Sequence, residues 1–456
     1  MVGFFKKIKE NSLREYSLTI TTVYLITYFI YRDFNISLVY GFSIISIGLI
    51  LMSVNVFYEK KLLISNTKLL FIIFTTIVFS FFLLPNSNKD KQNFAFIIVM
   101  ILMAGNLILS KINLRDMKIS AKIIQIFSII VSIYILFFQI FKSFYWSSVY
   151  LILSPSAKSY AEKYFFNGYS VSIGGITYTL YIITISFFIT LTKLMYCDSE
   201  PKKQNIILLF LLFFIIVLSG RRGELLAVIL TGIIYRLLST ELRHRKKMII
   251  KIMTISFLFL LLTIIFLPTL SKIPFLYRYT ITLEALFYGE NLSGGITSGR
   301  INLYSLSWNQ FKKHPLFGIG FGKFRALTES LGISNHGRGM DVHNIGLQLL
   351  AENGIFGFVF YLIIPIYICY NTIQDRLKIL NLKKDTKYSL ISVINGVSLL
   401  LQTFILIVSL IDPINYKIKF WILYFICFYL YSFSNNVVNE NETTYDLFSL
   451  SIKYIK

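Results

Sequence analysis

The chain has few residues of the kinds that build disulfide frameworks or metal centres. Of its 456 residues only three are cysteines, Cys197, Cys369 and Cys427, and none is paired in the sequence. There is no HExxH, GxSxG or CxxC motif, and no carboxylate cluster with metal-ligand spacing. These absences argue against a disulfide-stapled domain, a metal site and a covalent nucleophile. We therefore expect a chemistry that uses no metal and no cofactor.

Acidic residues are also scarce, with 22 Asp and Glu against 45 Lys and Arg, which gives a formal net charge of +23. The basic residues are spread over many loops, without a basic domain or an RNA-binding motif. This distribution argues against a nucleic-acid partner. It is better explained by membrane topology and by attraction to anionic lipid.

Hydrophobic residues are abundant, at 55% of the chain, and the mean hydropathy is +0.68. They form blocks of about 20 residues, which is the length that crosses a bilayer as a helix. No strands of alternating polarity are visible, and no internal repeat favours a secondary transporter. We predict an all-α polytopic integral membrane protein with about twelve transmembrane helices. The predicted helices cover residues 16–31, 37–58, 67–84, 93–110, 120–141, 171–193, 205–219, 222–239, 248–268, 343–370, 388–411 and 418–434.

The loop charges predict the orientation, because cytoplasmic loops carry the excess of Lys and Arg. If the N-terminal segment is cytoplasmic, the basic loops all fall inside, including Arg243–Lys251 and the last such loop with Arg376 and Lys378. The N-terminal segment has no cleavage site after an apolar core, so we expect a cytoplasmic lead. The predicted organisation is helices 1–9 in residues 1–268, a large outer loop in 269–342, helices 10–12 in 343–434 and a cytoplasmic tail in 435–456.

Two outer connectors are too long to be simple turns, and loops of such length are usually functional. Residues 142–170 are rich in aromatics. The larger connector, 269–342, is predicted to be partly helical. Ser298 is a suitable N-cap, Pro315 ends the first helix, and Gly332 closes a second helix over 323–331. The first helix carries an apolar stripe that would lie on the membrane surface or cap the bundle. The stripe consists of Ile301, Tyr304, Trp308 and Phe311.

A pair of arginines, Arg221 and Arg222, separates two apolar runs on the predicted outer side. Ionisable residues at membrane depth are costly, and a guanidinium suits phosphate oxygens. If Ser219-Gly220 breaks the helix, both arginines lie near the N-terminus of the next one, where an anion is favoured. The alternative is snorkelling to the headgroups, aided by Glu224.

Arg300 is a second candidate anion ligand, because it opens the predicted loop helix. A cation at a helix N-terminus is unfavourable for the helix, and a bound anion would remove that conflict. The alternative is a solvated surface arginine.

His343 is the sharpest single candidate among four histidines. It lies at the start of a helix that enters the membrane, where an imidazole can act as a general base. The alternative is a residue that stabilises the junction between loop and helix. Asp341 could orient the imidazole or be only a turn residue. The run Gly318-Ile319-Gly320-Phe321-Gly322 is interpreted as a tight turn that brings the backbone close to the membrane surface, because no strand precedes it.

The combined motif SGRRGELLA, then SGR, W, HPLFGIGFG, HN and LLAENGIFG, over roughly 219–357, resembles the O-antigen polymerase and ligase superfamily. The resemblance implies a GT-C-type bundle in the bacterial cytoplasmic membrane, with the active site on the outer face. It also implies an undecaprenyl-diphosphate-linked glycan as donor. Arg221 or Arg222, together with Arg300, would bind the diphosphate. The histidine and asparagine of the family fall on His343 and Asn344, and the histidine would activate the acceptor.

The leading functional prediction is a polysaccharide polymerase that elongates a glycan of the O-antigen or capsule type. The acceptor would be a lipid-linked repeat unit, with a flippase and a chain-length regulator as candidate partners. One alternative is a ligase that moves the glycan to a lipid or protein acceptor. Another is a transporter (a flippase for lipid-linked sugars), which predicts charges along several helices instead of at one face.

Overall fold

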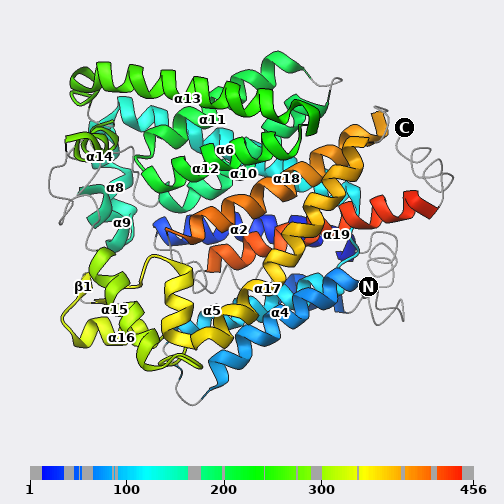
Figure 1. Cartoon of the computed structure of the whole chain (residues 1–456), viewed down its shortest axis with the longest axis horizontal. Coiled ribbons are helices and arrows are strands. Elements are labelled where there is room, and N and C mark those ends of the chain that lie inside the picture. Colours follow the sequence, from blue (N-terminus) through cyan, green and yellow to red (C-terminus); the bar gives the residue numbers. More distant parts are fainter. Residues whose placement is uncertain are drawn as a thin grey trace.

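The computed structural model is almost entirely helical (Figure 1). It describes residues 13–34, 46–50, 52–53, 65–84, 87, 91–162, 176–197, 201–240, 242–273, 276–288, 300–335, 338–381, 386–411 and 418–443. The first half of the chain contains η1 (Leu13–Tyr16), α2 (Ser17–Phe34), α4 (Asn66–Leu83), α5 (Lys91–Leu109), α6 (Leu114–Ile140), α7 (Lys142–Ser147), α8 (Val149–Ile152), α9 (Pro155–Tyr160), α10 (Ile176–Tyr196) and α11 (Lys202–Leu218). The second half contains α12 (Arg222–Leu238), α13 (Leu242–Leu270), α14 (Tyr277–Tyr288), α15 (Arg300–Lys313), α16 (Lys323–Ser330), β1 (Ser334–Asn335), β2 (Arg338–Gly339), α17 (Ile345–Asn381), α18 (Thr386–Ser409) and α19 (Ile418–Thr443). The strands β1 and β2 pair as a small antiparallel hairpin.

Six of the described helices are long and apolar enough to cross a membrane: α4, α6, α13, α17, α18 and α19. Helices α11 and α12 have 17 residues each, a length of about 25 Å at 1.5 Å per residue. The predicted total of about twelve membrane helices stays a prediction, as does the GT-C bundle. The segment predicted over 37–58 lies mostly outside the described residues.

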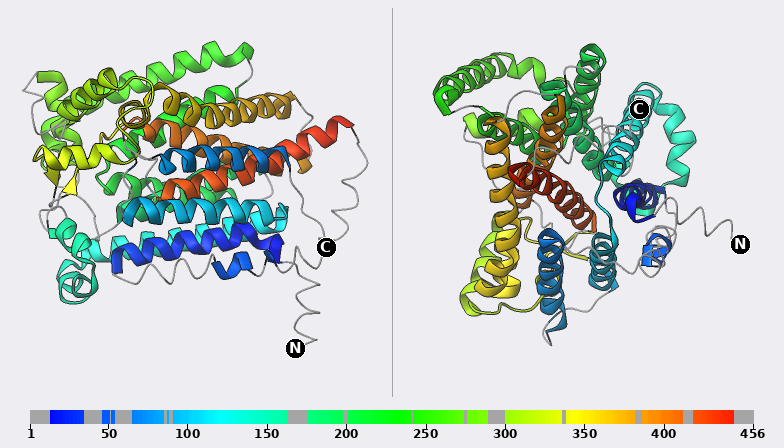
Figure 2. Two further views of the ribbon diagram at one scale, coloured as in Figure 1. Left: turned by 90° about the horizontal axis from the view of Figure 1, so that it is seen from below. Right: turned by 90° about the vertical axis from the view of Figure 1, so that its right-hand side faces the viewer.

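The bundle has a buried centre and an exposed edge. Nearly all side chains in the membrane windows of α18 and α19 are buried, whereas none is buried in that of α13. An aromatic cluster joins α4 to α19. In it the rings of Phe74 and Trp421 are stacked, with their centroids 5.0 Å apart. Helix α13 lies along one edge of the bundle in two views (Figures 1 and 2). A helix that is apolar on all sides and unburied within the protein is suited to contact lipid.

The two ends of the bundle differ. Helices α14, α15 and α16 gather at one end, while α2 begins and α19 finishes at the opposite end (Figures 1 and 2). This separation is compatible with the predicted topology, but the direction of the bundle relative to the cytoplasm stays a prediction.

Polar side chains cap helix ends at the end of the bundle where α2 begins, and one of these caps explains a difference from a predicted boundary. Helix α6 begins at Leu114 and not at residue 120, because Asn113 is its N-cap and accepts from the Asp116 N–H at 2.9 Å. Lys68, near the start of the predicted helix 67–84, is buried in α4 and donates to the Ser110 carbonyl at 2.5 Å, just beyond the end of α5. Cations near helix C-termini satisfy unpaired carbonyls and match the helix dipole.

Helix α17 is longer than predicted and is not continuous. Its backbone breaks at Gly354, with φ 63° and ψ −165°, and it contains Pro365. It extends to Asn381, so that Arg376 is completely buried inside the bundle. The expectation that Arg376 lies in a cytoplasmic loop was wrong.

Helix α19 also continues past its predicted end at residue 434, to Thr443. The reason is a small apolar cluster in which Val437 and Val438 pack against Ile379 and Ile391. Burial of these side chains favours helix over loop in an otherwise polar segment.

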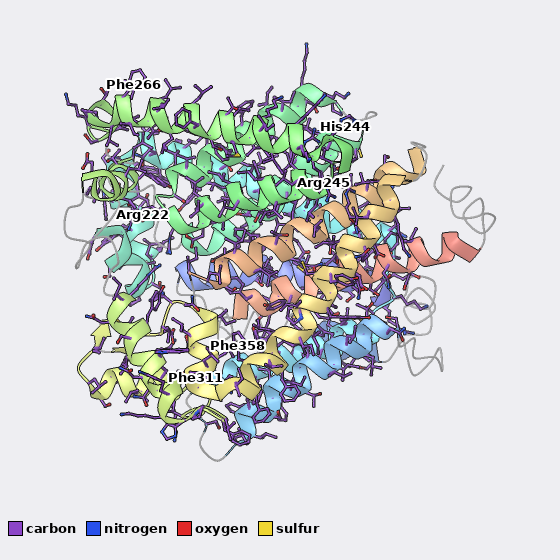
Figure 3. The ribbon with its side chains drawn as sticks, viewed as in Figure 1. Arg222, His244, Arg245, Phe266, Phe311 and Phe358 are labelled. Atoms are coloured by element: carbon purple, nitrogen blue, oxygen red, sulfur yellow. The ribbon has the colours of Figure 1, made fainter. Side chains whose placement is uncertain are left out.

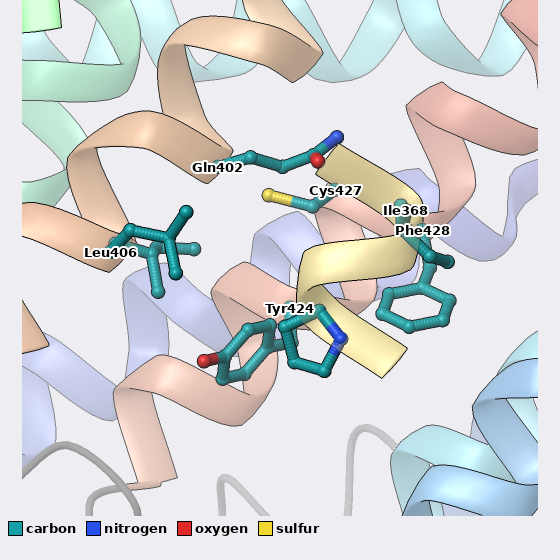
Figure 4. Close-up of a pocket in the computed structure, with 8 residues that line it drawn as sticks. Ile368, Gln402, Leu406, Tyr424, Cys427 and Phe428 are labelled. Atoms are coloured by element: carbon teal, nitrogen blue, oxygen red, sulfur yellow. The ribbon is translucent and has the colours of Figure 1, made fainter. Parts of the chain in front are cut away.

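A small cavity lies beside Pro365, between α17, α18 and α19 (Figure 4). Gln402, Tyr424 and Cys427 contribute its polar lining, and its volume of about 20 Å³ suits one water molecule. Ligand pockets measure several hundred Å³. This cavity is therefore too small to hold a sugar or a polyprenyl chain.

Candidate functional site

The arginine doublet lies at the sharp turn between α11 and α12. Gly220 has φ 63°, a conformation that favours glycine, and Ser219 accepts from the Arg221 N–H at 3.3 Å. Arg221 is at the N-cap position of α12, and Arg222 is its first residue. The predicted break at Ser219-Gly220 is thus confirmed. Both arginines lie at a helix N-terminus, where the backbone favours an anion.

The two arginines are held differently. Arg221 forms an ion pair with Glu224, with 3.6 Å between Nη1 and Oε1. Arg222 donates from Nη1 to the hydroxyl of Thr282 in α14. The Glu224 carboxylate compensates part of the charge of Arg221, and the Thr282 hydroxyl is a neutral hydrogen-bond partner of Arg222.

A second side chain of α14 bonds to the turn between α11 and α12, from the same face of α14 as Thr282. The Tyr279 hydroxyl donates to the Val217 carbonyl near the end of α11, at 3.0 Å. Tyr279 and Thr282 are three residues apart, so they project from one side of α14. Helix α14 therefore joins the end of α11 to the start of α12. Arg222 lies at the end of the bundle opposite His244 and Arg245 (Figure 3).

His343 lies in a strained turn immediately before α17. It is the only non-glycine among the described residues with a positive φ, 59°. Such a conformation costs free energy in a histidine and often occurs at functional sites. The next residue, Asn344, caps α17 by accepting from the Leu347 N–H at 3.0 Å. The junction between loop and helix is thus capped by Asn344, and the half-buried imidazole of His343 lies at the start of α17.

The end of α18 connects the two helix starts. Asn344 donates from Nδ2 to the Leu410 carbonyl at 3.1 Å. A Cβ added to Gly223, at the start of α12, would lie 2.5 Å from Cδ1 of Ile411. Leu410 and Ile411 are neighbours just after α18. The turn that carries Arg221 and Arg222 (the arginine turn) and the turn that carries His343 (the histidine turn) therefore lie beside the same end of α18.

Asp341 is an anchored residue two positions before His343. Its Oδ2 lies 2.5 Å from Nη2 of Arg325 in α16, and its Oδ1 accepts from Gln348 Nε2 at 3.4 Å. These contacts fix the turn that carries His343. A direct role of Asp341 in orienting the imidazole stays a prediction.

Arg300 is the first residue of α15 and is half-buried. Helix α15 packs on α17, with Ser307 donating to the Leu347 carbonyl at 2.7 Å. The predicted N-cap, Ser298, lies outside the described residues. Helix α15 packs through Leu303 and Ser307, whereas Ile301 and Trp308 of the predicted stripe are 56% and 46% exposed. These two side chains are available to a membrane surface, whereas Tyr304 packs against the cluster around Leu303.

The glycine run 318–322 forms the predicted tight turn, with positive φ at Gly318, Gly320 and Gly322. It lies against the break in α17, where the Gly320 N–H donates to the Glu352 carbonyl at 2.8 Å. The Glu352 carboxylate accepts from the Gly322 and Phe324 N–H groups. An internal carboxylate thus caps α16, so these amides are not open to a phosphate.

Sequence reasoning missed the roles of Thr282, Gln348 and Glu352. The signal for Glu352 was a carboxylate inside an apolar helix, which is costly unless it has a specific partner. Thr282 had no comparable signal. Within the described ranges, no group of three or more His, Cys, Asp or Glu side chains is arranged to hold a metal ion.

Residues 207–362 match the family model described as O-antigen ligase. This domain match supports the resemblance to the O-antigen polymerase and ligase superfamily. No curated protein matches the chain. The matched segment contains the arginine turn, helices α14–α16 and the start of α17.

The match to the O-antigen ligase family implies a glycosyl-transfer enzyme of the ligase or polymerase kind that acts on lipid-linked glycans. The apolar helices and the family together indicate a multi-pass protein of the inner membrane. In this O-antigen ligase domain, the candidate residues come from α12, α15 and the turn before α17.

Proposed function

We propose that the protein is a polysaccharide polymerase of the GT-C type that needs no metal. In this proposal it transfers a growing glycan from undecaprenyl diphosphate to the next lipid-linked repeat unit, at the outer face of the membrane. The observation that carries the proposal is the meeting of the arginine turn and the histidine turn at the end of α18. A site for this transfer needs a cationic group for the diphosphate and a base for the acceptor, both at one end of the bundle.

Each residue has a defined role in the proposed reaction. The acceptor hydroxyl oxygen attacks the anomeric carbon of the donor, and the bond from that carbon to the phosphate oxygen breaks. His343 takes the hydroxyl proton, and undecaprenyl diphosphate leaves with the bonding electrons. Arg222, aided by Arg221 and Arg300, stabilises the charge that develops on the leaving group, which is the electrostatic contribution expected to be largest.

The supporting residues keep these groups in place. Glu224 holds Arg221, and Asn344 caps α17 and fixes its start to α18. Asp341 fixes the residues before His343 through Arg325. A geometry that is set before substrate binds lowers the reorganisation needed in the transition state.

A ligase is the second candidate, because the matching family model is described as O-antigen ligase. It would use the same donor and the same groups, and it would differ only in the acceptor. The match of residues 207–362 to a family of glycosyl-transfer enzymes favours either candidate over the transporter alternative.

The test uses purified protein in lipid vesicles with a synthetic undecaprenyl-diphosphate oligosaccharide. We expect a ladder of longer lipid-linked products on a gel. Transfer only to an added lipid or peptide acceptor would instead make the protein a ligase. Movement of lipid-linked sugar across the vesicle membrane that survives replacement of Arg222 and His343 would refute the transferase proposal.

A further inference from the structure

The break in α17 is filled by the loop that precedes it. A Cβ at Gly354 would lie 2.2 Å from the Leu316 carbonyl oxygen, and one at Gly318 would lie 2.3 Å from the carbonyl carbon of Glu352. Neither contact leaves room for a side chain. The loop and the break therefore fit together backbone to backbone, and they separate the first turns of α17 from the rest of the helix.

Backbone hydrogen bonds hold this fit. The Ile319 N–H donates to the Ala351 carbonyl at 2.9 Å, and the Ile355 N–H donates to the Pro315 carbonyl at 2.8 Å. In an unbroken helix the Ile355 N–H would donate to the Ala351 carbonyl within α17, because these residues are four apart. The loop takes over that pairing, so the break leaves these buried groups satisfied.

The Glu352 side chain adds a connection to α16. It is completely buried, with Oε2 accepting from the Gly322 N–H and Oε1 from the Phe324 N–H, each at 3.0 Å. These amides belong to the N-terminus of α16, where a carboxylate is favoured by the helix dipole. A carboxylate on the first part of α17 thus holds the start of α16.

The polar contacts continue from Glu352 and form a closed ring. Gln348 donates from Nε2 toward Oε1 of Glu352 and toward Oδ1 of Asp341, at 3.4 Å in each case. Asp341 then pairs with Arg325, which follows Phe324 in α16. The ring touches the chain on both sides of His343, at Asp341 before it and at Gln348 after it.

We propose that Glu352 is a positioning residue for His343, acting through this ring. By holding α16 on the first turns of α17, it keeps the backbone of His343 in its left-handed conformation and so fixes the imidazole. The catalytic part of this inference rests on the proposed transfer function, whereas the mechanical part, the ring itself, does not. Glu352 does not contact substrate in this account.

The test compares Glu352→Gln with Glu329→Gln in full-length protein in lipid. Glu329 is an exposed carboxylate at the other end of α16, which makes it a matched control. An amide cannot accept at both of its terminal atoms, so one α16 N–H loses its partner. Hydrogen exchange is measured by mass spectrometry over 318–325 and 340–348, and transfer kinetics are measured with the synthetic donor.

For Glu352→Gln we expect exchange to rise about tenfold or more in both segments. We expect kcat to fall about tenfold, with the donor KM within about twofold of wild type, because positioning acts on the transition state. Glu329→Gln should match wild type in all readings. Unchanged exchange over 340–348, or an unchanged kcat, would overturn the inference.

A second variant, Gln348→Met, cuts the ring while leaving the Glu352 cap on α16 intact. It should raise exchange over 340–348 but not over 318–325, and it should lower kcat. Wild-type exchange and kcat in this variant would contradict the inference, even if Glu352→Gln fails to fold. If the wild-type protein shows no transfer at all, the proposed function fails, while the exchange data still decide whether the ring exists.

Discussion

One buried or half-buried arginine lies at each end of helix α12, Arg222 of α12 itself and Arg376 of the neighbouring α17, and the two are held in different ways. At the start, Arg222 is half-buried and bonds to a hydroxyl of α14. At the other end, Arg376 of α17 is completely buried between two aromatic rings. Its guanidinium carbon lies 4.4 Å from the ring centroid of Tyr196 and 5.5 Å from that of Tyr235.

The difference separates a structural cation from a candidate binding cation. Arg376 also donates to the Ser239 hydroxyl at 3.3 Å and to the Ser392 carbonyl at 3.2 Å, so it ties α17 to the end of α12 and to α18. Arg222 lies at a helix N-terminus beside a turn, near groups that a ligand anion can use. Changes near Arg222 should therefore reduce activity, and changes near Arg376 should reduce stability.

His343→Asn should have the largest effect on transfer. We expect turnover to fall by about a hundredfold or more, because a general base contributes that much or more. Asparagine tolerates a left-handed backbone, so thermal unfolding should stay near wild type. His343→Gly should be as inactive and slightly more stable, by about 1 kcal/mol, because it removes the strain. Full turnover in His343→Asn would end the general-base proposal.

Arg222→Ala should lower polymer formation by about a hundredfold, because one charged donor to the leaving group is lost. Arg222→Lys should restore only part of it, since a point charge does not reproduce the bidentate fork. Product ladders are compared at equal amounts of folded protein. Loss of protein from the membrane in place of loss of activity would assign Arg222 a folding role.

Arg376→Ala tests the arginine at the other end of α12, which we assign a structural role. We expect the free energy of unfolding to fall by about 3 kcal/mol, since packing and cation–π contacts are lost together. Arg236, exposed in the last turn of α12, gives the control variant Arg236→Ala, which should unfold like wild type. Thermal unfolding in detergent measures both. An inactive but fully stable Arg376→Ala protein would reverse the assignment of the two ends.

Thr282→Val should have the smallest effect. It removes the hydroxyl that accepts from Arg222 while keeping the shape of the side chain. We expect the donor KM to rise about threefold to tenfold, in keeping with the loss of about 1 kcal/mol from one hydrogen bond. Thr282→Ser should behave like wild type. Equal KM values for the Val and Ser variants would show that the contact does not position Arg222.

Local sequence signals predicted much of the fold. Apolar blocks located most helices, and Pro315 and Gly332 marked ends of loop segments that became α15 and α16. The turn at Ser219-Gly220 could also be predicted, because glycine tolerates its backbone. These features depend on neighbours in the sequence, which a pattern can display.

The remaining features depend on contacts between distant segments. Arg222 and Thr282 are 60 positions apart, and Asn344 and Leu410 are 66 positions apart. Nothing in a local pattern links such pairs. The break at Gly354 was also hidden, because a glycine inside an apolar helix is tolerated and breaks it only when another segment, here Leu316, fills the gap.

The most direct test is the rate of glycan transfer per folded molecule, compared between variants of the arginines at the two ends of α12. It uses vesicles containing wild type, Arg222→Ala or Arg376→Ala, a synthetic undecaprenyl-diphosphate oligosaccharide, and thermal unfolding of the same samples. The account predicts that Arg222→Ala is folded but forms the ladder about a hundredfold more slowly than wild type. It predicts that Arg376→Ala unfolds at a lower temperature but keeps the wild-type rate per folded molecule. A wild-type ladder from Arg222→Ala would contradict the central claim that the arginine turn belongs to the transfer site.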